Sequence, residues 1–140
     1  MRSRATIALA LTTLLHSASS ATARVGEGPD EWLDMPVAVV QALDKVTART
    51  TVMGLEVNSE GRYGTLRFKV RTCQRRPPTE TPESAAFIEI VDVRPDTGTR
   101  KLFAGWMFAS SPALNALEHP VYDIWLIDCS VAADESAAPG

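Results

Sequence analysis

The chain has 140 residues, of which 14 are lysine or arginine and 17 are aspartate or glutamate, and its formal net charge is −3 at pH 7. This length suffices for one domain with its own core. The acidic balance argues against a nucleic-acid partner, because it would repel a phosphate backbone and only Arg71, Arg75 and Arg76 cluster.

The first 23 residues have the pattern of a cleavable signal peptide. Arg2 and Arg4 precede an uncharged, mostly apolar run from Ala5 to Leu15, and Ala21-Thr22-Ala23 provides small residues at the two positions that signal peptidase reads. The apolar run is roughly half as long as a membrane-spanning helix, and no later segment approaches that length. We therefore expect residues 1–23 to be removed and the mature chain to be exported without a transmembrane segment.

Residues 24–42 are expected to form an acidic arm and linker, because glycine, proline and acidic residues leave too little apolar surface to order the first part. The apolar stretch 37–43 at its end is compatible with a short helix or with the entry to the first strand. The folded domain is expected over residues 43–129, followed by a disordered tail over residues 130–140. Three apolar residues of the arm are candidates for docking on the domain or on a partner: Trp32, Leu33 and Met35.

From residue 45 the sequence predicts short strands separated by turns. The clearest strand contains residues 66–71, where apolar and basic side chains alternate with the period of two that gives one dry and one wet face. Residues 121–129 are apolar on both alternating sets, which predicts a central strand buried on both faces. Other strands, with turns at Gly54, 59–61 and 95–98, are predicted over residues 46–52, 55–57, 87–93 and 101–109.

Two connections have a distinctive composition. Residues 75–83 contain three prolines, which remove hydrogen-bond donors and favour an extended loop. Ser110-Ser111-Pro112 precedes good helix formers at 113–118, and this pattern predicts one short helix that is capped by a hydroxyl and ends at His119. The fold class that follows is all-β, as a small β-sandwich or a partly open β-barrel with one short helix.

Both cysteines lie in the part predicted to be exported, and each ends an apolar strand-like run. An oxidising compartment favours a disulfide between Cys73 and Cys129, which would stabilise the fold by roughly 4 kcal/mol in the chain-entropy model. A redox role is disfavoured because redox-active pairs usually have a Cys-x-x-Cys spacing. We therefore predict a structural disulfide.

Several segments of the predicted domain closely resemble the signature of an uncharacterised bacterial family, the domain of unknown function 2155. The segments are Leu43-Asp44-Lys45-Val46-Thr47-Ala48, Tyr63-Gly64-Thr65-Leu66, Cys73 with Arg75-Arg76-Pro77-Pro78-Thr79-Glu80, and the run from Leu102 to Trp125. The resemblance implies an exported protein of the Gram-negative envelope, located in the periplasm. It carries no assigned reaction, so it transfers no catalytic residues.

No catalytic motif accompanies this pattern in the sequence. It contains no glycine-rich phosphate loop, calcium-loop motif or His-Glu-x-x-His element, so neither a cofactor nor a metal is expected. His119, the only histidine after the predicted signal peptide, is interpreted as the residue that hydrogen-bonds a carbonyl at the end of the short helix. The alternative is a small periplasmic hydrolase in which His119 acts with Ser110 or Asp123.

The leading functional hypothesis is an accessory domain without catalytic activity that binds another envelope protein or a glycan. Binding would use a strand edge or an aromatic and proline-rich surface. Most aromatic residues are expected in the core, with an exposed patch around Trp106 as the alternative. A further alternative is a structural subunit of an envelope complex, attached through the acidic arm. The candidate partner-binding residues are Arg75, Arg76, Pro77, Pro78, Trp106, His119 and Tyr122.

Overall fold

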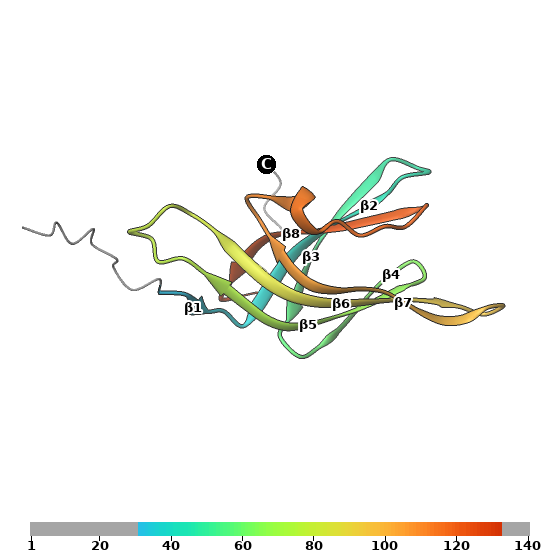
Figure 1. Ribbon diagram of the computed structural model, residues 1–140, viewed down its shortest axis with the longest axis horizontal. Coiled ribbons are helices and arrows are strands. Elements are labelled where there is room, and N and C mark those ends of the chain that lie inside the picture. Colours follow the sequence, from blue (N-terminus) through green and yellow to red (C-terminus); the bar gives the residue numbers. More distant parts are fainter. Residues whose placement is uncertain (1–30, 133–140) are drawn as a thin grey trace, which may run out of the picture.

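The computed structural model describes residues 31–132, which form two antiparallel sheets packed face to face (Figure 1). The larger sheet has the order β1-β5-β6-β7, with β4 beside β1 on the same edge of β5, and the smaller sheet has the order β3-β2-β8. The all-β prediction is confirmed, and over these residues the sheets do not close into a barrel. The strands are β1 (Leu33–Asp34), β2 (Val37–Asp44), β3 (Arg49–Glu56), β4 (Glu60–Tyr63), β5 (Leu66–Arg75), β6 (Ser84–Arg94), β7 (Gly98–Phe108) and β8 (Tyr122–Ser130).

Two predicted segments fall largely outside the described range. These are the signal peptide, residues 1–23, and residues 133–140 of the predicted tail. Ser130, which was assigned to the tail, is instead the last residue of β8. Within the described range, no helix has the length and apolarity that a membrane span requires.

Strand β5 shows how the sequence sets the two layers. Leu66, Phe68 and Val70 are buried in the core between the sheets, as their alternation predicts. The pairing with β6 shifts register after Val70, so that Arg71 has no partner residue on β6. This bulge changes which face the following residues occupy. As a result Cys73 also lies in the core, where it forms the predicted disulfide with Cys129.

Strand β8 carries the matching irregularity. Ile124 and Leu126 are buried in the core, but the pairing with β2 skips Ile127 between Leu126 and Asp128. This second bulge turns Cys129 inward and leaves Ile127 39% exposed. The prediction that β8 is a central strand is wrong, because it lies at the edge of the smaller sheet and its second apolar set includes this exposed bulge residue.

The central strand of the smaller sheet is β2. Residues 37–42 were assigned to a linker, but they form most of this strand, so the predicted domain boundary at residue 43 is too late. Ala38 and Val40 pack in the core, and Val39 on the alternate face is also buried. Burial on both faces explains why this stretch is uniformly apolar and shows no strand periodicity.

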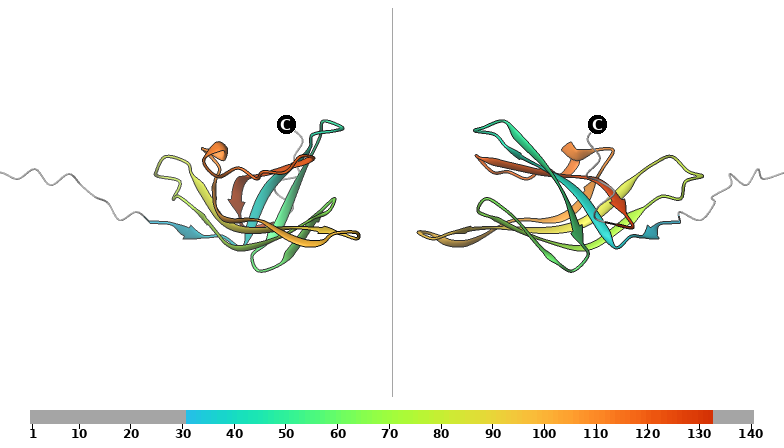
Figure 2. Two further views of the ribbon diagram at one scale, coloured as in Figure 1. Left: turned by 45° about the vertical axis from the view of Figure 1, so that its right-hand side comes forward. Right: turned by 180° about the vertical axis from the view of Figure 1, so that it is seen from behind.

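The turn predicted at Gly54 is also wrong. Strand β3 runs through Gly54, and the chain reverses at residues 45–48, which form the hairpin tip (Figure 2). Asp44 Oδ1 accepts hydrogen bonds from the backbone N–H of Val46 at 2.9 Å and of Thr47 at 3.1 Å. An aspartate that bonds the N–H groups two and three residues ahead favours a turn, and this interaction outweighs the strand propensity of the residues that follow.

The predicted hairpin of β6 and β7 is confirmed, with its turn between Arg94 and Gly98. The predicted short helix is a 3-10 turn over Pro112–Asn115, and the Ser111 side chain makes no capping hydrogen bond. Asn115 instead donates from Nδ2 to the carbonyl of Trp106 at 2.7 Å, which holds the turn against the outer edge of β7.

The apolar residues of the N-terminal arm dock on the domain itself. Strand β1 pairs with the end of β5, where Leu33 lies opposite Arg75. The guanidinium of Arg76 lies 4.5 Å from the centre of the Trp32 ring, a cation–π contact. The N–H of Met35 donates to the carbonyl of Cys73 at 2.8 Å. These contacts fix the start of the described chain beside the proline-rich loop.

Candidate functional site

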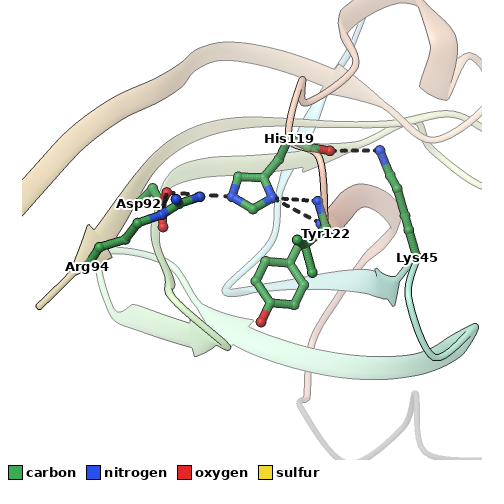
Figure 3. Close-up of polar contacts among 6 residues, drawn as sticks. Lys45, Asp92, Arg94, His119 and Tyr122 are labelled. Carbon is green, nitrogen blue, oxygen red and sulfur yellow. Dashed lines mark hydrogen bonds and ion pairs between the residues drawn. The ribbon is translucent and has the colours of Figure 1, made fainter. Parts of the chain in front are cut away.

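The first candidate is a buried polar cluster around His119, between the 3-10 turn and β8 (Figure 3). His119 is only 5% exposed. Its Nδ1 accepts hydrogen bonds from the backbone N–H of Val121 at 3.1 Å and of Tyr122 at 3.0 Å. Because Nδ1 accepts two hydrogen bonds, the proton of the neutral ring is on Nε2, which faces Asp92 Oδ2 at 3.5 Å.

Asp92 holds the charge of this cluster. It lies on β6 at 2% exposure, and its Oδ2 accepts a hydrogen bond from Arg94 Nε at 2.7 Å. The Thr65 hydroxyl and then the Arg94 guanidinium lower the pKa of Asp92, while burial opposes them. The Thr65 hydroxyl lies beside the carboxylate without ideal hydrogen-bond geometry, so we attribute its effect to its dipole. The effects of Thr65 and Arg94 together outweigh the effect of burial.

Replacing Asp92 by asparagine is expected to change the acid stability of the protein. Because the folded-state pKa lies below the ordinary value of 3.8, the ionised carboxylate stabilises the fold above pH 3.8, and this contribution is lost as the pH falls through the folded-state pKa. Asp92→Asn should therefore lower the free energy of unfolding by about 1–2 kcal/mol at pH 6 and by less at pH 3. Urea unfolding at both pH values measures this, and an equal loss at both would contradict it.

The contacts of this cluster do not support the hydrolase alternative. The Ser110 hydroxyl donates to Glu83 Oε2, and Asp123 Oδ1 accepts from the N–H of Ile124 at 3.0 Å. Among the described residues no hydrogen bond joins either side chain to His119. Nδ1 of His119 is already occupied and its Nε2 faces a buried carboxylate, so the ring is not placed to take a proton from a substrate.

The surroundings of His119 give it a structural role. The ring of Tyr122 stacks on the imidazole with centroids 5.2 Å apart, and Lys45 Nζ donates to the His119 carbonyl at 3.0 Å. The expected bond from the imidazole to a helix carbonyl is not formed, because the 3-10 turn ends at Asn115 and the nearest polar groups are backbone N–H donors. His119 thus fixes the chain that enters β8.

The second candidate is a surface groove between the proline-rich loop and the end of β8. Its volume is about 610 Å³. It is lined by Arg75, Arg76, Pro77, Pro78, Glu80, Pro82, Glu83, Ser84, Ala109, Ser110, Ile127 and Asp128. A neighbouring hollow of about 360 Å³ shares Arg75, Ile127 and Asp128 with it. Because they share these residues, the two hollows are adjacent, and we call them together the groove.

The carboxylates of the groove are satisfied within the domain. Glu83 Oε1 accepts from the N–H of Ser84 and of Ser110, both at 3.0 Å. Burial raises the pKa of Glu83, but the hydrogen bonds from Ser110 and Ser84 outweigh it and hold the pKa below its ordinary value. Asp128 Oδ1 accepts from the Ser84 hydroxyl at 2.7 Å and from the N–H of Cys129 at 2.7 Å.

The cations of the groove differ from each other. Arg76 forms an ion pair with Glu80 at 3.1 Å and stacks on Trp32. The Arg75 side chain makes no hydrogen bond, ion pair or ring contact with any residue in the range 31–132, although it lines both hollows. The groove therefore contains a guanidinium whose hydrogen-bond donors are not used within the described domain, beside carboxylates and apolar side chains.

Comparison with known proteins places the chain in a family. The family described as "Uncharacterized protein conserved in bacteria (DUF2155)" matches residues 38–129, from β2 to the second cysteine. The chain belongs to this family. This confirms the resemblance inferred from the sequence, and both sheets and the disulfide lie within the matched range of the DUF2155 domain.

The chain is similar in sequence to the "Uncharacterized protein RP359" of Rickettsia prowazekii (strain Madrid E). It is 32% identical over 88 residues, which cover 63% of this chain and 57% of the relative. The chain thus spans little more than half the length of that protein. No solved structure matches the chain.

The DUF2155 domain brings some of the sequence-predicted binding residues together and separates others. The predicted loop residues all line the groove: Arg75, Arg76, Pro77 and Pro78. Trp106 lies on β7, 38% exposed, and packs edge-to-face on Phe87 with ring centroids 5.8 Å apart. It is not among the residues that line the groove. His119 and Tyr122 belong to the buried cluster, so burial contradicts a surface role for His119.

Sequence reasoning missed the opposite wall of the groove, which is formed by Ile127, Asp128 and Val131. One signal for it was present. The apolar residues Leu126 and Ile127 are adjacent, so strict alternation places one of them on the solvent side of the strand.

Within residues 31–132, no group of three or more histidine, cysteine, aspartate or glutamate residues is arranged to hold a metal ion.

Proposed function

We propose that this protein is an exported accessory domain of the bacterial cell envelope that binds another envelope component through the groove and has no catalytic activity. The observation that carries the proposal is the groove, in which an arginine without a hydrogen-bond partner among the described residues lies beside apolar side chains. Groups that are left unpaired in a concave, partly apolar surface favour a binding site. The signal-peptide pattern and the disulfide support an oxidising exported location.

The disulfide supports this use of the groove because it joins the two walls. Cys73 lies two residues before Arg75, and Cys129 directly follows Asp128. The walls are further joined by the hydrogen bond from the Ser84 hydroxyl to Asp128. A surface held in this way loses little conformational entropy when a partner binds, which increases affinity.

The other functional hypotheses have less support. The hydrolase alternative has no assembled catalytic group around His119. The alternative of a structural subunit attached through the acidic arm is weakened at residues 31–35, because Trp32 and Leu33 already contact the domain itself. We therefore place the partner at the groove.

Photo-crosslinking in the bacterium that produces the protein tests this proposal. With p-benzoylphenylalanine at position 127, in the groove, we expect an adduct with one envelope component. The same group at position 46, in the exposed tip between β2 and β3, is the control and should give no such adduct. Mass spectrometry identifies the adduct and shows whether the mature chain begins at Arg24. Equal adducts from both positions, or an intact Met1, would contradict the proposal.

A further inference from the structure

The outer face of the larger sheet, which points away from the smaller sheet, carries a row of cations. Arg62 on β4 lies directly opposite Arg67 on β5. Arg67 lies opposite Val91 on β6, and Val91 lies opposite Lys101 on β7. Residues directly opposite each other share a face of the sheet, and Phe68, next to Arg67, is buried in the core, so the row lies on the outer face. With strands about 4.8 Å apart, the row spans roughly 14 Å.

The charge of this row is not compensated within the domain. Among residues 31–132, none of its three cations forms an ion pair. Arg67 donates from Nη1 to the carbonyl of Leu66 at 3.1 Å, and this neutral acceptor leaves its charge in place. Like charges directly opposite each other destabilise a sheet, as Arg62 and Arg67 are placed here. The sheet therefore keeps this arrangement at a cost to its own stability.

The next row on the same face is balanced. Lys69 lies opposite Glu60 on one side and Glu89 on the other, and Glu89 forms an ion pair with Arg71 at 2.8 Å. A further carboxylate, Asp34, lies on β1, which pairs with the other end of β5. The three cations of the first row are thus a local excess of positive charge in a chain whose formal net charge is −3.

Two aromatic side chains lie on the same face as the cations. Phe87 is four positions before Val91 on β6, so both point to the outer face, roughly 13 Å apart. Trp106 lies opposite Phe87 on β7, packs against it edge-to-face and is 38% exposed. Tryptophan combines an apolar ring with a polar N–H, and it is enriched where the headgroups of a membrane meet its apolar interior.

We propose that the outer face of the larger sheet docks on the anionic surface of a lipid bilayer, with the cation row at the lipid phosphates and Trp106 at the level of the headgroups. The row lies on an open sheet face, and its residues do not line the groove. The charge of the row alone also suits an acidic protein. The aromatic pair favours the bilayer, because an interface of phosphates above apolar chains matches both parts of the face.

This inference goes beyond the proposed function, because it concerns another surface of the domain. A partner bound in the groove and a bilayer bound at the outer face are independent, so either proposal can fail without the other. Crosslinking at position 127 tests the groove, and lipid vesicles test the outer face.

Vesicle binding tests the inference. The protein recovered from the producing bacterium, with its disulfide intact, is mixed with phosphatidylcholine vesicles that contain increasing fractions of phosphatidylglycerol, and the bound fraction is measured by flotation. We expect binding to increase with the anionic fraction and to decrease with added salt. Arg62→Glu should weaken binding to the anionic vesicles about 30-fold, because it changes the charge of the row by two units and each unit contributes roughly fivefold.

The matched control is Arg49→Glu, which makes the same charge change at an exposed position of β3 in the smaller sheet. It should leave vesicle binding almost unchanged. Thermal unfolding separates a docking defect from a folding defect. Arg62→Glu replaces a like-charge pair by an ion pair with Arg67, so its melting temperature should equal or exceed that of the wild type.

Brominated phosphatidylglycerol tests contact with the bilayer itself, because bromine quenches tryptophan fluorescence at short range. We expect quenching in the wild type and loss of most of it in Trp106→Phe, since Trp125 lies on β8 of the smaller sheet and Trp32 packs on Arg76. The inference is overturned if anionic vesicles do not bind the protein, if phosphatidylcholine vesicles bind it equally well, or if the two glutamate variants have equal effects. Binding without quenching also overturns it, because the face would then act by charge alone, as toward an acidic protein.

Discussion

Replacing Cys73 and Cys129 together by alanine is expected to lower the free energy of unfolding by about 4 kcal/mol. The two residues are 56 positions apart in sequence, and their Cα atoms are 5.7 Å apart across the two sheets. Without the bond, the unfolded chain regains the freedom of this long loop. Since small domains have a total stability of only about 5–15 kcal/mol, the loss is a large share of it.

Urea unfolding at neutral pH measures this loss. Wild-type protein unfolded in excess dithiothreitol is the matched control, because it removes the same cross-link without changing the sequence. We expect the reduced wild type and the double alanine variant to unfold at similar urea concentrations, both well below the oxidised wild type. If reduction leaves the unfolding midpoint unchanged, the cross-link does not stabilise the fold as we describe.

Replacing His119 by alanine is expected to lower the free energy of unfolding by about 3 kcal/mol. The imidazole Nδ1 is the acceptor for the N–H groups of Val121 and Tyr122, and these would lose their partner at a partly buried site. The ring of Tyr122 would also lose its stacking partner. A catalytic histidine on the surface would behave differently, because its removal would leave stability almost unchanged.

His119→Asn is the matched variant that separates the two roles. The oxygen of an asparagine side chain can occupy nearly the same place as Nδ1 and accept the same N–H hydrogen bonds. We therefore expect asparagine to restore roughly half of the stability that alanine removes, as measured by thermal and urea unfolding. Equal stability of the alanine variant and the wild type would show that the imidazole does not hold the entry to β8.

The elements that sequence analysis predicted correctly are those in which a local signal determines the structure. Strand β5 has a strict period of two over residues 66–71, and the loop after it contains prolines that cannot join a sheet ladder. The disulfide was predicted from the compartment and from the position of each cysteine at the end of an apolar run. The hairpin of β6 and β7 followed from its turn residues.

The elements that were missed depend on contacts between distant segments. Strand β2 has no periodicity because side chains on both of its faces are buried, and the burial of a central strand depends on segments that are distant in sequence. β8 resembles a central strand, but the order β3-β2-β8 places it at an edge, and strand order does not follow from the apolarity of one segment. The true turn at residues 45–48 was indicated only by the Asp44 side chain.

The candidate site was predictable on one side only. The proline-rich loop with Arg75 is recognisable from composition, but the opposite wall depends on how β8 lies against the start of β6. The role of His119 was not predictable, because its partner Asp92 is 27 positions away on β6 of the larger sheet, whereas His119 lies in the connection that leads into β8 of the smaller sheet. Pairing of this kind is determined by the packing of the sheets and leaves no local pattern.

The two bulges link strand pairing to oxidation. Cys73 and Cys129 face one another only because each follows one unpaired residue, Arg71 in one strand and Ile127 in the other. A chain in which either strand paired without its extra residue would direct one thiol to the solvent, where it could not reach the other. Once formed, the disulfide therefore fixes the register of both strands in the folded chain, because a strand displaced by one residue is incompatible with the bond.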